Sequence, residues 1–320
     1  MSKHEGPYFD DLQVGDVFDD APALTLTNGD AAVHRSILGS RLRLSLDHDL
    51  SQRVTGRVLA DPSLVWDVSI GQSTVATRRV VANLFYRGLA FRRFPAIGDT
   101  LHTTTTVVGL KQNSSGPTGL AALRISTRDQ EGRQVLDFWR CAMLPLSSPD
   151  VNTGHHDDLA AIGDPIDVNA AVADIMMWDL ASLPASRAAL ETGQSWTVAA
   201  GDVVLDAPQL ARTTLNLAHV HHDEFSQPSG RLVYGGHTIG IALAQLTRTL
   251  PDLVTIGGWH SCDHLGPVRE GDTLTSRITI EHVEQVADGF SAATTRIEVD
   301  SRGPEGTQPV LDWRLLAISA

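Results

Sequence analysis

The chain has 320 residues, of which 42% are hydrophobic and 20% are charged, a composition typical of a soluble globular protein long enough for two hydrophobic cores. Its formal net charge is −13, and Lys3 and Lys111 are its only lysines, so neither a nucleic acid nor an anionic membrane is expected as a partner. No apolar run approaches the roughly 20 residues of a membrane-crossing helix, and the first residues lack a signal-peptide core, so the sequence predicts a cytoplasmic protein.

The chain repeats itself. Three short markers occur twice in the same order: GDVFDDAPAL at 15–24 and GDVVLDAPQL at 201–210, GDTL at 98–101 and at 271–274, and VLDFWR at 135–140 and VLDWR at 310–314. A repeat this long indicates two copies of one domain rather than a solenoid. We therefore predict an N-terminal domain over residues 1–150, a connection over 151–190 with a polar start, and a C-terminal domain over 191–320.

Each copy shows the same order of predicted elements. A short strand at the Gly-Asp marker is followed by a polar segment, an apolar helix, and two or three long strands. In the second copy, apolar and polar residues alternate over 274–280 and 297–299. Turns between such strands are predicted at 112–116 in the first copy and at 300–303 in the second. Helices followed by antiparallel strands predict an α+β fold in which a sheet covers a helix.

The clearest helix of the second copy begins at a double glycine. Apolar residues recur at helical intervals from Ile239 to Leu250, and Pro251 ends the run. Gly235 and Gly236 thus lie where backbone N–H groups lack helical partners and the helix dipole is positive. An oxygen gaining negative charge would be stabilised there. The alternative is that the glycines only form a tight turn beneath a packed helix.

Ionisable side chains cluster just before this helix, in the run NLAHVHHD at 216–223 and the run RLVYGGH at 231–237. Together with the free N–H groups, they supply what is needed to polarise a carbonyl beside a proton-transfer site. Histidines are also abundant at 219–222 and at 260–264. Their spacing fits no standard zinc pattern, so we expect no metal. The two cysteines, Cys141 and Cys262, indicate reduced thiols.

These motifs resemble the MaoC-like, or hydratase-2, branch of the hot-dog fold. The catalytic box of that family reads Asp, any, Asn, Pro, aliphatic, His. The matching positions are 216–221, where His221 is kept and Asn216 replaces the aspartate. The family's helix-start His-Gly corresponds to Tyr234 and Gly235. The resemblance implies a tandem (double) hot-dog fold, in which the two halves form an intramolecular pseudo-dimer. Further homo-oligomerisation is left open.

Within this family the chain looks closest to the tandem hot-dog mesaconyl-CoA hydratases, also called β-methylmalyl-CoA dehydratases, on the run RLVYGGH and on first-half segments at 27–32, 38–41 and 81–84. This implies a hydro-lyase acting on a short, C4–C5 dicarboxylic enoyl-CoA, with coenzyme A as part of the substrate and no separate cofactor. Two alternatives stay open. A hot-dog thioesterase would need a carboxylate where Asn216 stands, and a non-catalytic acyl-CoA binding protein would need neither group.

The resemblance assigns roles residue by residue. His221 would be the general base, Asn216 would orient the water, and the N–H groups of Gly235 and Gly236 would hold the thioester carbonyl. Asp223 or His222 would supply a second acid. The candidates for substrate binding are Arg231, Tyr234, His237 and Asp223. Arg231 would meet a substrate carboxylate as a bidentate partner, or else it pairs with an acidic residue of the protein.

In the first copy the corresponding box is SRLRLS at 40–45, with Ser40 and Ser45 where the family has its acid and base. Neither hydroxyl is a competent base near neutral pH. The sequence therefore predicts one active site per chain, in the second copy, with the first copy walling the acyl-CoA channel.

Overall fold

The computed structural model describes residues 5–184, 189–287 and 290–319. The first unit comprises η2 (Phe9–Asp11), β1 (Val17–Phe18), β2 (Leu24–Thr25), α1 (Asn28–Leu38), α2 (Arg43–Leu46), α3 (His48–Thr55), α4 (Pro62–Gln72), η3 (Ser73–Ala76), β3 (Ala82–Phe91), β4 (Thr100–Gln112), β5 (Thr118–Arg128) and β6 (Gln134–Pro145). The second comprises β7 (Ser195–Thr197), β8 (Asp202–Val203), α6 (Ala207–Thr213), η7 (His219–His221), α7 (Gly235–Thr249), β9 (Leu253–His264), β10 (Thr273–Ala287), β11 (Phe290–Gly303) and β12 (Gly306–Ser319).

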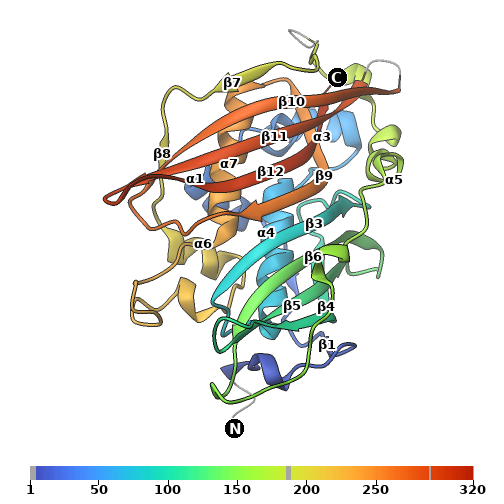
Figure 1. Cartoon of the computed structure of the whole chain (residues 1–320). Helices are drawn as coiled ribbons and strands as arrows, with labels where there is room; N and C mark the ends of the chain where they lie inside the picture. Colours follow the sequence, from blue (N-terminus) through green and yellow to red (C-terminus); the bar gives the residue numbers. More distant parts are fainter. Residues whose placement is uncertain (1–4, 185–188, 288–289, 320) are drawn as a thin grey trace.

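The two units join edge to edge into one antiparallel sheet, with strand order β1-β4-β5-β6-β3-β9-β12-β11-β10-β7. Strands β3 and β9 form the seam, where Leu89 pairs with Trp259 and Ala90 with Gly258 (Figure 1). A Cβ atom on Gly258 would lie 2.2 Å from the carbonyl oxygen of Leu89, so only glycine allows this approach. The predicted double hot-dog fold, with its α+β class, is confirmed.

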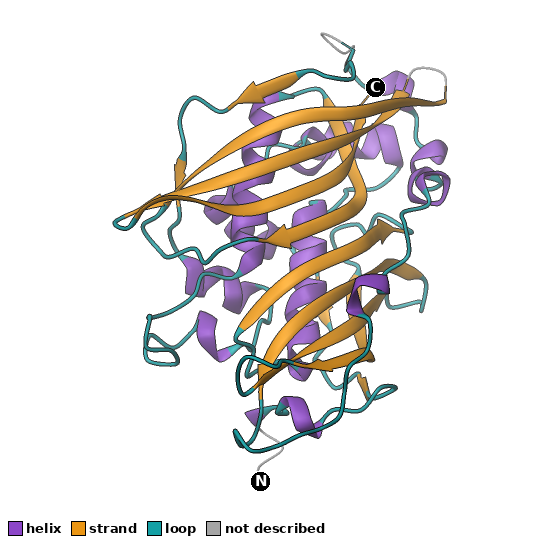
Figure 2. Ribbon diagram, in the orientation of Figure 1, coloured by secondary structure: helices purple, strands orange, loops and turns teal. Residues whose placement is uncertain are grey.

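The long helices α4 and α7 lie on the same face of the sheet (Figure 2). Every residue of α4 is buried, and the polar residues Ser63, Asp67, Ser69 and Gln72 are buried together with the apolar ones. Trp66 of α4 packs against Trp259 and Trp313 of the second unit, with ring centroids 4.9 and 6.1 Å apart. The aromatic core therefore crosses the seam and fixes one unit against the other. No helix in the described part of the chain is long and apolar enough to cross a membrane.

One local expectation differs from the structure. The predicted turn at 300–303 is strand: β11 continues to Gly303, which pairs with Gly306, so the chain reverses between them. Gly306 has a φ of 112°, a conformation that glycine adopts without strain, and this sets the position of the turn.

The described part of the connection between the units contains short helices: η4 (Leu159–Ala161), α5 (Val168–Val172), η5 (Ile175–Met177) and η6 (Leu180–Ser182).

Candidate active site

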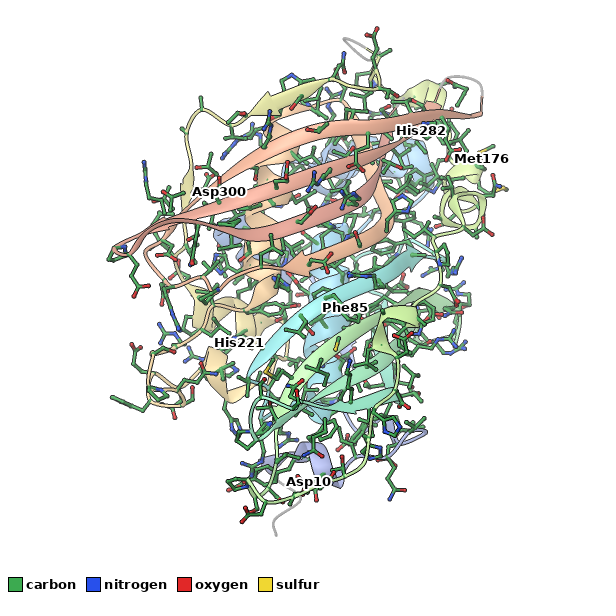
Figure 3. The ribbon with its side chains drawn as sticks, in the orientation of Figure 1. Asp10, Phe85, Met176, His221, His282 and Asp300 are labelled. Atoms are coloured by element: carbon green, nitrogen blue, oxygen red, sulfur yellow. The ribbon has the colours of Figure 1, made fainter. Side chains whose placement is uncertain are left out.

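A cavity of about 410 Å³ lies where the two units meet, a size that suits a small-molecule site. Four of the residues singled out from sequence line it: Asn216, His221, Tyr234 and Gly235. The first unit contributes side chains that include Tyr86 of β3 and Arg140 of β6. Figure 3 shows His221 beside the strands of the first unit, consistent with a cavity shared by both halves.

The segment that carries the box is pinned to the first unit. Thr74 Oγ1 accepts a hydrogen bond of 2.8 Å from the N–H of Leu217. A Cβ atom on Gly71 would lie 1.7 Å from the carbonyl oxygen of Thr214, so this turn packs directly on the backbone of α4. Leu215 takes a φ of 60°, which is unusual for a non-glycine residue and bends the chain just before Asn216. The box thus depends on the first unit for its position.

His221 is oriented for base chemistry. Its Nδ1 lies 2.9 Å from the carbonyl oxygen of Leu232. A carbonyl can only accept, so Nδ1 carries the proton and Nε2 carries the lone pair. Burial lowers the pKa of His221 to about 4, and the positive charge of Arg140 contributes to the lowering. The imidazole is therefore neutral, and able to accept a proton, throughout the neutral pH range.

Asn216 is buried, and its side chain both makes a hydrogen bond within the box segment and lines the cavity. Its Oδ1 accepts a hydrogen bond of 2.9 Å from the N–H of Ala218. Its backbone carbonyl accepts one of 2.6 Å from Nε2 of His222. The second lone pair of Oδ1 and the N–H groups of the amide are the groups of Asn216 that remain to hold a water molecule.

The start of α7 is open towards the cavity. Tyr234 is its N-cap residue and makes no capping hydrogen bond, so the first N–H groups of the helix are not satisfied by a side chain. The double glycine has a steric reason. A Cβ atom on Gly235 would lie 2.6 Å from the ring of His264, and one on Gly236 would lie 2.2 Å from Oδ1 of Asp67. The glycines therefore permit close packing on both sides of the helix start.

Tyr234 links the cavity to a buried polar chain. Its hydroxyl donates a hydrogen bond of 3.0 Å to Asp67 of α4, whose other oxygen lies 2.8 Å from Nε2 of His34 on α1. All three side chains are at most 3% exposed. Burial raises the pKa of the Asp67 carboxyl, while the hydrogen bond to His34 opposes the rise. This chain of contacts holds the Tyr234 ring 5.6 Å from the ring of His221.

Other predicted site residues do not line the cavity. Arg231 is paired with Glu224, 3.3 Å away, and with Glu270. Asp223 is exposed, and its side chain accepts the N–H of Phe225 in a local turn. His237 is fully buried in the first turn of α7, and Gly236 faces Asp67. The sequence could not separate Gly236 and His237 from Tyr234 and Gly235, because a helix start turns neighbouring residues to opposite sides. The substrate contacts of these residues are not part of the function proposed below.

The sequence reasoning missed lining residues that include Tyr86, Arg140 and His264. His264 ends β9, and its ring lies against Gly235. Its Nε2 has no hydrogen-bond partner within the described chain, and burial lowers its pKa to about 4. No group of three or more metal-ligating side chains occurs among the described residues.

The first unit keeps a smaller cavity, of about 190 Å³, lined by Ser40 and Ser45. Ser40 donates a hydrogen bond of 2.7 Å to Asp61, the N-cap residue of α4. Asp61 also accepts the N–H of Ser63 at 2.8 Å, and Pro62, the first residue of α4, has no N–H. This helix start is capped and lacks the donors that α7 leaves open.

The chain is similar to a solved double hot-dog structure and to two curated enzymes. No protein-family profile matches the chain. A solved double hot-dog structure from Mycobacterium tuberculosis is 50% identical, covers 99% of both chains and has a TM-score of 0.90. The β-methylmalyl-CoA dehydratase of Chloroflexus aurantiacus is 28% identical over 84% of this chain and 80% of its own length. The mesaconyl-CoA hydratase of Cereibacter sphaeroides is 27% identical over 95% of this chain and 92% of its own.

Proposed function

We propose that this double hot-dog protein is a MaoC-like hydro-lyase that adds water to, or removes it from, the α,β bond of an enoyl-CoA thioester. One observation carries the proposal. A neutral imidazole, His221, lines the same cavity as the uncapped helix start at Gly235. The relatives named as hydratase and dehydratase support the same reaction class.

The reaction needs one base and one site for negative charge. In the hydration direction, Nε2 of His221 takes a proton from water as the oxygen attacks the β carbon. Electrons move to the thioester carbonyl, and the resulting enolate is stabilised by the N–H group of Gly235 at the start of α7, an effect typically worth about 3 kcal/mol for such a donor. The imidazolium then returns the proton to the α carbon. The same group accepts and returns the proton, so no second acid is required.

The cavity favours this reaction over thioester hydrolysis. A hot-dog thioesterase that directs water with a carboxylate would need an acidic side chain on the cavity wall. Among the described residues, none of those that line the cavity is Asp or Glu, and Asn216 stands at the position of the family's aspartate. The non-catalytic alternative is disfavoured by the neutral imidazole of His221 in the cavity wall, a proton acceptor that a binding protein would not require.

For the substrate, the finer proposal is a short, branched, C4–C5 dicarboxylic acyl-CoA such as mesaconyl-CoA or β-methylmalyl-CoA. The names of the two curated relatives support this class, and the cavity volume suits a small acyl group. The test is to incubate the pure protein with a panel of enoyl-CoA and hydroxyacyl-CoA esters and to detect gain or loss of water by mass. Release of free coenzyme A instead would support a thioesterase, and an unchanged panel would support a binding protein.

The pH dependence of kcat/KM should reflect the pKa of His221, which burial lowers. The base must be neutral to accept a proton, and its pKa of about 4 keeps it neutral well below pH 6.5. Activity should therefore be nearly constant from about pH 8 to about pH 5.5, where an unperturbed histidine would already have lost roughly tenfold. Steady-state rates at each pH, with the fold checked by circular dichroism, give the profile. An acid limb centred near 6.5 would contradict the assignment.

The two units should contribute unequally to catalysis. Replacing Ser40 and Ser45 together with alanine should change kcat less than about threefold, because neither hydroxyl is a competent base. The loss of the Ser40–Asp61 hydrogen bond should cost about 1 kcal/mol of unfolding free energy. Rate and urea unfolding are measured on the same preparation. A folded double variant without activity would show that the first unit takes part in proton transfer.

A further inference from the structure

Strand β6 carries an arginine on its inward face. Side chains of alternate residues lie on the same face of a strand. Phe138 and Ala142, two residues to either side of Arg140, are both 0% exposed, and Arg140 itself is only 3% exposed. A charged side chain therefore occupies a position in a series of core residues.

The sequence repeat suggests that this arginine is the counterpart of Arg314, and the structure shows otherwise. The equivalent ion pairs Arg124–Asp137 and Arg296–Asp312 align the two units. Arg124 pairs across the sheet with Trp139, whereas Arg296 pairs with Arg314, so Trp139 is the counterpart of Arg314.

Arg140 is therefore the structural counterpart of Leu315, which is fully buried. The first copy has one more residue in this marker, and a shift of one residue moves a side chain to the opposite face of a strand. Arg314 lies on the outer face and pairs with Glu281 at 3.0 Å. An arginine has thus replaced a core leucine on the inner face of the first unit, where the cavity lies.

The surroundings of Arg140 hold it in place without neutralising it. Nη2 donates to the carbonyl oxygen of Ser73 at 3.2 Å and to Thr77 Oγ1 at 2.7 Å. Nε is buried and has no hydrogen-bond partner within the described chain. Across the described ranges, no carboxylate lies within ion-pair distance of the guanidinium. The groups that interact electrostatically with it are Tyr86, Tyr234 and Cys141. These groups are neutral at pH 7, so the charge is unpaired.

We propose that Arg140 binds the free carboxylate of a dicarboxylic acyl-CoA and thereby determines the substrate class. The inference rests on the proposed hydro-lyase function. An unpaired buried charge is unfavourable, and a carboxylate that enters the cavity would pair with the unused face of the guanidinium. The phosphates of coenzyme A are poor alternatives, because they are attached to a large nucleotide and Arg140 is almost fully enclosed. Arg231 cannot take this role while it pairs with two glutamates.

The test compares two ligands that differ at the carboxylate alone. They are mesaconyl-CoA and 2-methylcrotonyl-CoA, in which a methyl group replaces the free carboxylate. Dissociation constants are measured by calorimetry in a His221→Gln background, in which turnover is expected to be at least about a hundredfold slower. Arg140→Met keeps the apolar stem and removes the charge, Arg140→Lys keeps the charge, and Arg231→Met is the matched control. Urea unfolding midpoints verify that each variant is folded.

In the His221→Gln protein with Arg140 intact, which is the parent protein of the comparison, we expect mesaconyl-CoA to bind at least about tenfold more tightly than 2-methylcrotonyl-CoA. Arg140→Met should reduce this preference to within about threefold, Arg140→Lys should keep part of it, and Arg231→Met should leave it unchanged. A preference that survives Arg140→Met, an equal loss for both ligands, or no preference in the parent protein would each overturn the proposal. Failure of the hydro-lyase assignment would appear separately, as absent water addition by the wild-type protein despite a preference that depends on Arg140.

Discussion

Replacing His221 with glutamine is expected to lower kcat by about a hundredfold or more, and replacement with alanine should do the same. Glutamine has similar bulk and can still donate a hydrogen bond to the carbonyl of Leu232, but it cannot accept a proton from water. Substrate binding should change little, because the side chain acts on the water rather than on coenzyme A. Steady-state kinetics with mesaconyl-CoA would measure both parameters.

The matched control is His219→Gln, which alters an exposed histidine in the same short helix η7, outside the cavity wall. It should keep kcat within a few-fold of the wild type. The assignment of the base would be wrong if the His221 variants retained comparable activity, or if the control lost as much as they did.

The second large effect is expected on stability. Asp67→Ala should lower the free energy of unfolding by about 3–5 kcal/mol, because it leaves His34 and Tyr234 without their buried partner. It also removes the group that holds Tyr234 at the cavity wall, so activity should fall with stability. Equilibrium unfolding in urea gives the free energy of unfolding, and steady-state kinetics give the activity.

Asp150→Ala is the control for that measurement, since Asp150 is exposed and should change the unfolding free energy by no more than about 0.5 kcal/mol. Asp67→Asn retains an acceptor for the Tyr234 hydroxyl, so its loss of unfolding free energy should lie between those of Asp67→Ala and Asp150→Ala. If Asp67→Ala were as stable as the Asp150 variant, the polar chain from His34 to Tyr234 would not contribute to the fold.

Sequence patterns predicted the fold and the centre of the site because both depend on local signals. The helical spacing after Gly235 fixed the helix, and the box residues Asn216 and His221 precede it by a short, recognisable distance. The position of Asp67 was not accessible in this way. It lies far from Tyr234 in the sequence, and the two meet only because α4 and α7 pack on the same face of the sheet.

Strand register explains why the sequence did not identify Arg140 as a residue of the cavity wall. The repeated marker VLDFWR and VLDWR aligns two arginines by letter, yet Arg140 lies inward and Arg314 outward. A single additional residue is a minor difference in a sequence alignment and a complete reversal of side-chain direction in a strand. Arg231 was the candidate from sequence because it lies close to the helix start, and Arg140 was not considered for this role.

The central claim is that this chain adds water to an enoyl-CoA at one site, with His221 as base. The most direct measurement is to incubate the wild-type protein and His221→Gln with mesaconyl-CoA in water enriched in heavy oxygen and to analyse the products by mass. The wild type should place one heavy oxygen in a hydroxyl group of the acyl chain with the thioester intact, and the variant should do so at least about a hundredfold more slowly. Heavy oxygen in a released free acid, or equal labelling by the variant, would contradict the claim.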